Sequence, residues 1–327
     1  MLSAYYALKG FVVTFLSLTL LAITPLLRLK RWRVIHCVNA GTSDDFNSFY
    51  RYAWARSIAL RFVFVPISFI HSPAYGWSIV LATSKTNKQL RSDHRFIKDI
   101  VQQIGRWKCD RVSLNGVMPS AADTHKAWPS SSNISNSKYG TTYMLIQNIK
   151  QITQIHGYTN PKIAVIGCGR AGQLLIQQLT ELDYSVLGFD ISPKENIPSN
   201  VYVGCDFSKV ASCQIIILLT ERGNSGLSVI KPYLLPGQTI LSDTHPKPSP
   251  EAWDSIRSLN CHIYEAATTL EGLAFFPALP SWRPDTMPGC AVQAITESII
   301  GTDLKTYDDF DQKASEVGVK SRLDTPV

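Results

Sequence analysis

The chain has 327 residues, a length that suits about two domains. Hydrophobic residues make up 45% of it and charged residues only 17%, which provides ample material for buried cores and suggests contact with a membrane. The formal net charge is +7, and four of the cations lie together at Arg28, Lys30, Arg31 and Arg33. A basic cluster beside an apolar run is typical of a membrane topology signal, and no RNA- or DNA-binding motif follows it. We therefore expect no nucleic-acid partner.

The seven cysteines are odd in number and scattered along the chain. No CxxC pair and no cluster of cysteine and histidine has the spacing of a zinc site. The pattern indicates free thiols in a reducing compartment and predicts no metal site.

The N-terminal region contains an apolar segment from Gly10 to Leu27, 18 residues without a charge. This length is at the lower limit for a helix that spans about 30 Å of hydrocarbon. Because the basic cluster follows the segment, a cleaved secretory signal is disfavoured, and the body of the protein is expected to face the cytoplasm. We predict a membrane anchor or embedded helix here. The alternative is a helix buried in a globular core, which Pro25 favours.

The next part of the chain has the pattern of a small α/β domain. Apolar residues on either side of HSPAYG predict two strands joined by a turn. The apolar periodicity of residues 96–104 predicts a helix with Ser92 as its N-cap, and DRVSLNGVMPSA predicts a short strand and a turn. A longer helix is predicted from about Thr142 to His156, with Gly157 as its stop.

From residue 162 onward, strands alternate with helices of a length that implies a parallel sheet with right-handed crossovers. The expected strands are Lys162–Ile166, Ser185–Phe189, Gln214–Leu219, Thr239–Ser242 and a strand near His262–Tyr264. The expected helices are Gly169–Leu182, helices near Leu227–Leu235 and Pro250–Leu259, and a last helix that starts after Gly289 and ends near Ile300. The polar tail after Gly301 is expected to be mobile.

These elements define an α/β fold class: a Rossmann-type parallel sheet preceded by a smaller α/β domain and an N-terminal apolar helix. The expected boundaries are residues 1–35 for the apolar segment, 36–140 for the substrate domain, 141–301 for the Rossmann domain and 302–327 for the tail.

The segment PKIAVIGCGRAGQLLIQQL contains a complete strand, GxGxxG turn and helix. Gly167 allows the tight turn, Gly169 lets the backbone approach a pyrophosphate at the positive end of the helix, and Gly172 lets the helix pack closely on the strand. The other turn residues are Cys168, Arg170 and Ala171, of which Cys168 is expected to be a small side chain that faces the sheet. The context predicts a dinucleotide site.

The second strand of this unit ends at Asp190, eighteen residues beyond Gly172, where an acidic group accepts hydrogen bonds from the adenosine ribose. Asp190 favours NAD over NADP because its carboxylate repels a 2′-phosphate, while Lys194 nearby offsets this effect. Thr220 and Glu221, at the end of the third expected strand, are candidates for the nicotinamide half on position alone.

Cys290 opens the predicted last helix, where unpaired backbone N–H groups and the helix dipole stabilise a thiolate. It is a candidate nucleophile, and the alternative is a small buried apolar residue.

His245 and Lys247, in SDTHPKPSP, follow a sheet strand at the edge where ligands of open sheets bind. Either could donate a proton to a developing alkoxide. The alternative is a proline-rich surface loop. His94 and His156 are expected to be solvated or capping residues.

Taken in order, these parts resemble the long-chain acyl-acyl-carrier-protein reductases, which share the two-domain layout of shikimate dehydrogenase and glutamyl-tRNA reductase. The resemblance covers roughly residues 74–300 and rests on RVSLNGVMPS, KYGTTYMLIQNIKQI, SDTHPKP and MPGCAVQAITESI. It implies that Cys290 accepts an acyl group from a thioester. It also implies NADPH, whereas Asp190 favours NADH, so the expected cofactor is NAD or NADP.

The sequence thus predicts an NAD(P)-dependent oxidoreductase, and three hypotheses remain open. The first is reduction of a fatty acyl thioester to an aldehyde through a Cys290 acyl-enzyme, with an apolar N-terminal segment suited to a lipid substrate and a membrane. The second is a non-covalent dehydrogenase of a small hydroxy or amino acid, with Lys247 or His245 as the proton partner. The third is a membrane-tethered protein that binds NAD(P) without turnover. The oligomeric state does not follow from the sequence.

Overall fold

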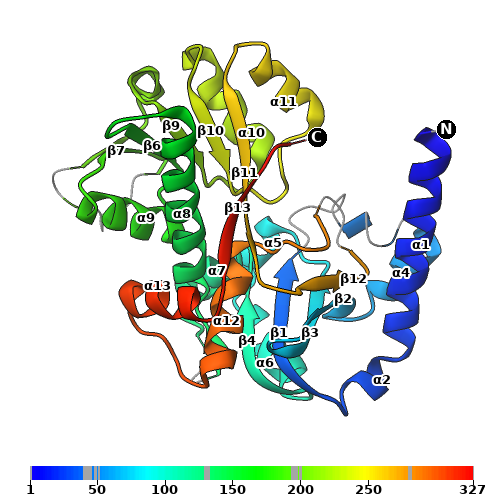
Figure 1. Cartoon of the computed structure of the whole chain (residues 1–327). Helices are drawn as coiled ribbons and strands as arrows, with labels where there is room; N and C mark the ends of the chain where they lie inside the picture. The colour runs from blue at the N-terminus through cyan, green and yellow to red at the C-terminus, as the bar shows by residue number, and fades with distance from the viewer. Residues whose placement is uncertain are drawn as a thin grey trace. The chain divides into compact units, whose positions relative to one another are not determined.

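The computed structural model describes residues 2–39, 46–47, 50, 52–128, 133–192, 198, 201–278 and 282–326. The chain forms two compact units (Figure 1). Unit 1 comprises Met1–Ser137 and Thr269–Val319, and unit 2 comprises Lys138–Thr268 and Lys320–Val327. This division differs from the expected boundaries, because the chain returns to unit 1 after residue 268 instead of completing the Rossmann domain.

Unit 2 contains a seven-stranded sheet in the order β13-β11-β10-β9-β6-β7-β8. The six strands from β8 to β11 in this order pair in parallel. The strands are β6 (Lys162–Ile166), β7 (Ser185–Phe189), β8 (Tyr202–Gly204), β9 (Ile215–Leu218), β10 (Thr239–Ser242), β11 (His262–Thr269) and β13 (Lys320–Asp324). The order reverses between β6 and β9, as in a doubly wound Rossmann sheet, so the expectation of a parallel Rossmann-type sheet is confirmed.

The helices of unit 2 cover this sheet. They are α8 (Lys138–His156), α9 (Arg170–Glu181), α10 (Gly223–Ile230) and α11 (Pro250–Arg257), with short 3₁₀ helices at Phe207–Ser212 and Lys231–Tyr233. The sequence of β9 reads IIIL and all four residues are buried, which is the pattern of a strand covered on both faces. Trp253 of α11 and Leu227 of α10 pack into the same apolar core as Ile216 of β9.

Unit 1 contains a six-stranded sheet in the order β12-β2-β3-β1-β4-β5. Strands β3, β1, β4 and β5 pair in parallel, whereas β2 and β12 add antiparallel edges. The strands are β1 (Arg31–Asn39), β2 (Val65–Ser72), β3 (Gly76–Thr83), β4 (Lys108–Leu114), β5 (Ile134–Ser135) and β12 (Ala274–Phe276). The helices are α1 (Leu2–Ala22), α2 (Thr24–Leu27), α4 (Ala53–Ala59), α5 (Asn87–Ser92), α6 (Phe96–Ile104), α7 (Met118–Thr124), α12 (Gly289–Ile300) and α13 (Tyr307–Glu316).

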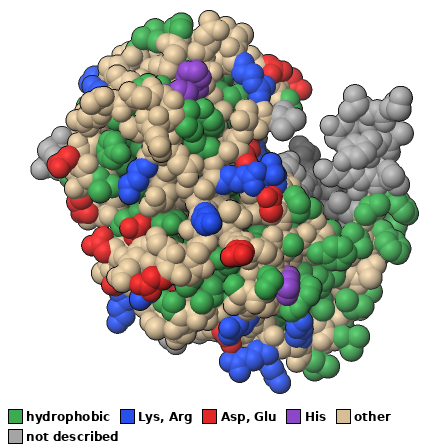
Figure 2. Space-filling model, in the orientation of Figure 1, with side chains coloured by type: hydrophobic (Ala, Val, Ile, Leu, Met, Phe, Trp, Pro, Cys, Tyr) green, Lys and Arg blue, Asp and Glu red, His purple; other side chains and the backbone are tan. Residues whose placement is uncertain are grey.

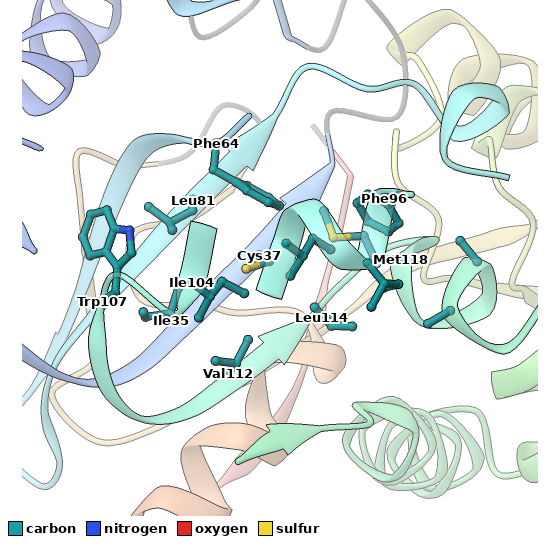
Figure 3. Packing of buried hydrophobic residues seen from close by; sticks show 14 of the residues in the cluster. Ile35, Cys37, Phe64, Leu81, Phe96, Ile104, Trp107, Val112, Leu114 and Met118 are labelled. Atoms are coloured by element: carbon teal, nitrogen blue, oxygen red, sulfur yellow. The ribbon is translucent and has the colours of Figure 1, made fainter. Parts of the chain in front are cut away.

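Successive side chains along each strand of unit 1 point to opposite faces of its sheet. Ile35 and Cys37 of β1 and Val112 and Leu114 of β4 point to one face, where they join the core under α6 and α7 (Figure 3). His36 lies on the other face, opposite Ser113. Helix α12 packs on β4 and β1, which explains why this late segment belongs to unit 1.

The N-terminal segment packs on unit 1. Among the described helices, none is long and apolar enough to cross a membrane. The predicted membrane anchor over Gly10–Leu27 is therefore wrong, and so is the predicted membrane-associated localisation with a catalytic part facing the cytoplasm. The segment is split between α1 and α2, and α1 packs against β2 and α4. Its apolar composition serves this packing, although Phe11 and Phe15 remain exposed. Figure 2 shows that apolar side chains also gather elsewhere on the surface of the chain.

The basic cluster has a structural role in part. Arg31 and Arg33 lie on β1, and both bind Asp110 of the neighbouring β4, at 2.7 and 3.0 Å. Opposite charges on adjacent strands stabilise the pairing modestly, because these guanidinium groups are solvent-exposed.

Several local expectations change in the structure. The two strands around HSPAYG form as β2 and β3, but Ser92 ends α5, and the next helix α6 begins at Phe96 instead. The tail is ordered: α13 begins at an N-cap in which Thr306 Oγ1 accepts from the Asp309 N–H, and β13 joins the sheet of unit 2. The prediction of a mobile polar tail is wrong because this pairing depends on distant parts of the chain.

Candidate active site

The glycine turn lies between β6 and α9, at the carboxyl edge of the unit 2 sheet. Gly167 has a φ of +105°, and a Cβ there would lie 2.7 Å from the Leu219 carbonyl oxygen. A Cβ on Gly172 would lie 2.1 Å from the Gly167 carbonyl oxygen. Both positions therefore require glycine, the first for backbone conformation and the second for the contact between helix and turn.

Gly169 differs from its two neighbours. It precedes the first residue of α9, and a Cβ built on it would meet no atom within 4 Å. The glycine there is not needed for the fold, and the space beside it lies at the positive end of a 12-residue helix. Arg170 and Ala171 form the first helical residues. This arrangement fits the pyrophosphate of a dinucleotide.

Asp190 lies directly beside the turn. Its Oδ2 accepts from the Cys168 N–H at 2.8 Å, and its Oδ1 accepts from the Ser192 N–H at 2.8 Å. The carboxylate is thus fixed at the end of β7, where an adenosine ribose would bind. Lys194, which was expected to offset this charge, lies outside the described residues.

The side chain of Cys168 is buried beneath the turn. Burial, together with the charge of Asp190, raises the pKa of the Cys168 thiol to about 12. The thiol is therefore an apolar packing group, as expected for a small side chain facing the sheet.

Thr220 and Glu221 follow β9. Thr220 Oγ1 donates to the Arg222 carbonyl oxygen at 3.0 Å, which closes the loop before α10. A Cβ on Gly226 would lie 2.4 Å from Thr220 Oγ1, so the hydroxyl also packs on that helix. The Glu221 side chain is exposed. The structure gives Thr220 a role in loop geometry, next to the half of the sheet where nicotinamide would lie.

The segment after β10 carries a histidine and a carboxylate in contact. His245 Nε2 lies 3.3 Å from Asp243 Oδ1. The Asp243 side chain is 9% exposed and that of His245 is 34% exposed, so the carboxylate lies beneath a partly accessible ring. Because β9 and β10 are neighbours in the sheet, this pair is on the same edge as the glycine turn.

Lys247, two residues further, is held in an ion pair. Its Nζ lies 2.5 Å from Glu265 Oε2, and Trp253 Nε1 donates to the other oxygen at 3.4 Å. Both charged side chains are mostly buried. The Lys247 ammonium is therefore already paired with a carboxylate on β11. This pairing makes His245 the better candidate for proton transfer.

Cys290 belongs to unit 1. It is the second residue of α12 and is partly buried, and its carbonyl oxygen accepts from Ser113 Oγ at 3.2 Å. The expected position at the start of a helix is observed, and this helix packs on the unit 1 sheet.

Two further histidines behave differently from each other. His94 is exposed, as expected. His156, the last residue of α8, lies 3.1 Å from the Tyr264 hydroxyl, with its ring 4.2 Å from that of His262. Burial, and the neighbouring His262, lower the pKa of His156.

Sequence reasoning missed Asp243 and Glu265. Asp243 stands within the SDTHPKPSP motif, and an aspartate two residues before a candidate histidine was an available signal. Glu265 is 18 residues from Lys247, and only the parallel pairing of β10 with β11 brings them together. No group of three or more potential metal ligands occurs in the described ranges.

No family model and no curated protein matches this chain. Solved structures that match parts of this chain include L-tryptophan dehydrogenase from Nostoc punctiforme, with a TM-score of 0.41, 14% identity and coverage of 89% of this chain and 82% of that one. An imine reductase variant from Myxococcus stipitatus in complex with NAD+ gives a TM-score of 0.30 and 17% identity over 36% of this chain and 46% of that one. A D-isomer specific 2-hydroxyacid dehydrogenase from Xanthobacter autotrophicus Py2 in complex with NADPH gives a TM-score of 0.30 and 16% identity. This match covers 46% of this chain and 75% of that one.

The chain spans less than half the length of the imine reductases that it matches. None of these similarities supports the acyl-acyl-carrier-protein reductase resemblance. With TM-scores below 0.5, they assign no reaction, and the function has to be inferred from the residues of the site.

Proposed function

We propose that the chain is an NAD(P)-dependent oxidoreductase that acts on a small hydroxy or amino acid without a covalent enzyme intermediate. One observation carries the proposal: a glycine turn with free space at Gly169 shares a sheet edge with a histidine that a buried aspartate supports. The first feature suits a dinucleotide and the second suits proton transfer.

The cofactor would be held by the turn and by the start of α9. The backbone at Gly167 and Gly169 allows close approach of a pyrophosphate, and the amide groups of the first helical turn favour its charge. Asp190 would bind the ribose hydroxyls and disfavour a 2′-phosphate, which favours NAD over NADP.

A nicotinamide, when bound, supplies or accepts a hydride. Addition of a hydride to the carbonyl carbon of an oxo acid, or to the corresponding imine, leaves an oxygen or nitrogen that needs one proton. The imidazolium of His245 would donate that proton, and in the oxidative direction the neutral ring would accept it. Lys247 is a poorer donor because its ammonium is paired with Glu265.

The test is NADH oxidation with pyruvate, phenylpyruvate and 2-oxoglutarate, each with and without ammonium. His245→Gln should lower kcat on the order of 100- to 10,000-fold with little change in NADH affinity. His94→Gln, which changes an exposed histidine of unit 1, is the matched control and should retain full activity. Full activity of His245→Gln would overturn the assignment of the proton donor.

A second candidate is acyl thioester reduction, which the position of Cys290 at the start of a 12-residue helix favours. Helix N-terminal amides stabilise a thiolate, which would attack the thioester carbonyl and release the carrier thiol. A hydride would then displace the Cys290 thiolate and yield the aldehyde. Cys290→Ser should abolish aldehyde formation from an acyl thioester, whereas Cys205→Ser, at an exposed cysteine, should not. Under the first proposal, Cys290→Ser leaves oxo-acid reduction intact.

A further inference from the structure

We infer that Asp243 is a positioning residue, which holds the imidazole of His245 in place at the edge of the sheet. The inference deepens the proposed oxidoreductase function and rests on it. Asp243 would not touch the substrate and would act only through the ring.

The geometry of the pair supports this role. Asp243 Oδ1 is buried, and within the described part of the chain it accepts no hydrogen bond. His245 Nε2 is also buried, 3.3 Å from that oxygen, which is within ion-pair distance once the ring is protonated.

The backbone around the pair is fixed on both sides. The Asp243 N–H donates to the Leu218 carbonyl oxygen of β9 at 3.0 Å, which extends the ladder between β9 and β10 by one residue. The side chains of Ser242 and Thr244 bond to each other at 2.9 Å. The Gly223 N–H donates to the Pro246 carbonyl oxygen at 3.1 Å. The aspartate is thus anchored to the sheet, and the histidine follows within two residues.

A carboxylate suits this position beside a proton donor. The form of histidine that donates to an alkoxide carries a positive charge, which is opposite to the charge of a carboxylate. At 3.3 Å from the ring, Asp243 would therefore restrain the imidazole without contacting the substrate.

The experiment compares Asp243→Asn with Asp254→Asn. Asp254 is a matched control because it is also paired with a cation, Arg257, but its side chain is 70% exposed on α11. With NADH and the 2-oxo acids named above, Asp243→Asn should lower kcat on the order of 100-fold or more, while KM and the Kd for NADH stay nearly constant. Asp254→Asn should match the wild type.

A second readout is independent of turnover. In the protein without cofactor, the imidazole ring signal of His245 in proton NMR, assigned by its absence in His245→Gln, should shift in Asp243→Ala because the neighbouring carboxylate is lost. A kcat for Asp243→Asn close to that of the wild type, a parallel loss of kcat and NADH affinity, or an unchanged signal in Asp243→Ala would overturn the inference. If the wild type transfers no hydride to any of these probes, the proposed function fails, and the role of Asp243 fails with it.

Discussion

The carboxyl edges of the two parallel sheets differ in chemical character. In unit 2, this edge carries ionisable side chains, among them Asp190, Asp243 and His245. In unit 1, the parallel strands end in neutral side chains that bond to one another: Ser113 Oγ lies 2.8 Å from Asn115 Oδ1 and 3.3 Å from Ser137 Oγ.

The difference shows that a parallel sheet alone does not define a site. The neutral side chains of unit 1 are buried and saturate one another, so they stabilise the fold but do not exchange protons in the usual pH range. The charged groups of unit 2 are fixed on the same kind of framework but remain partly accessible.

The largest effect at neutral pH is expected for Gly172→Ala. Its Cβ would lie 2.1 Å from the Gly167 carbonyl oxygen, so either the turn or α9 must move. We expect a loss of stability of about 3 kcal/mol and no measurable NADH binding. Urea unfolding measures the loss of stability, and calorimetric titration measures the loss of NADH binding. Stability like that of the wild type would show that the turn is not as tightly packed as described.

The next effect is the pH dependence of stability that His36 of unit 1 causes. Burial lowers the pKa of His36 to about 3, from an ordinary value near 6.5. As the pH falls from about 6.5 towards 3, the unfolded chain binds a proton that the folded chain does not, so this group lowers stability by about 1.4 kcal/mol per pH unit. His36→Leu should flatten this slope.

The measurement is the urea midpoint as a function of pH for the wild type, His36→Leu and the exposed-histidine control His94→Gln. The control should keep the slope of the wild type. Parallel curves for the wild type and His36→Leu would contradict burial of a neutral imidazole at this position.

A smaller effect is expected for Asp190→Asn. Loss of the charge should weaken NADH binding on the order of 10-fold and improve NADPH binding relative to NADH. The amide oxygen can still accept from the Cys168 N–H, so the fold should tolerate the change. Asp183→Asn, at an exposed aspartate before β7, should leave both affinities unchanged. An unchanged NADH to NADPH ratio in Asp190→Asn would show that this carboxylate does not select the cofactor.

The smallest effect is expected for Thr306→Ala. Removal of this N-cap of α13 should cost about 1 kcal/mol of stability in urea unfolding, and NADH binding in unit 2 should not change. Thr302→Ala, at an exposed residue outside a helix, is the control. Equal stability of the two variants would mean that α13 contributes little to unit 1.

The sequence allowed five of the seven strands of the unit 2 sheet to be located, whereas β8 and β13 were not predicted. β6, β7 and β10 have the expected bounds because buried apolar runs end at clear turn residues. The glycine turn and the start of α12 were also located, since Gly167–Gly172 and Pro288–Gly289 are strong local signals.

Other features depend on long-range contacts. Composition does not distinguish an apolar helix that covers β2 from one that enters a membrane, and this is where the prediction for Gly10–Leu27 failed. The return of the chain to unit 1 and the strand β13 require partners more than a hundred residues away. The ion pair of Lys247 with Glu265 likewise needs the register of β10 and β11.

The most direct test of the central claim is calorimetric titration of NADH into the wild type and Gly169→Ala. A Cβ at Gly169 meets no protein atom within 4 Å, so the fold should keep its thermal stability, and only the approach of a pyrophosphate should be blocked. We predict saturable binding to the wild type and binding on the order of 100-fold weaker in Gly169→Ala, with the same Tm. Equal affinity in the two proteins, or no binding by the wild type, would contradict the assignment of this edge as a dinucleotide site.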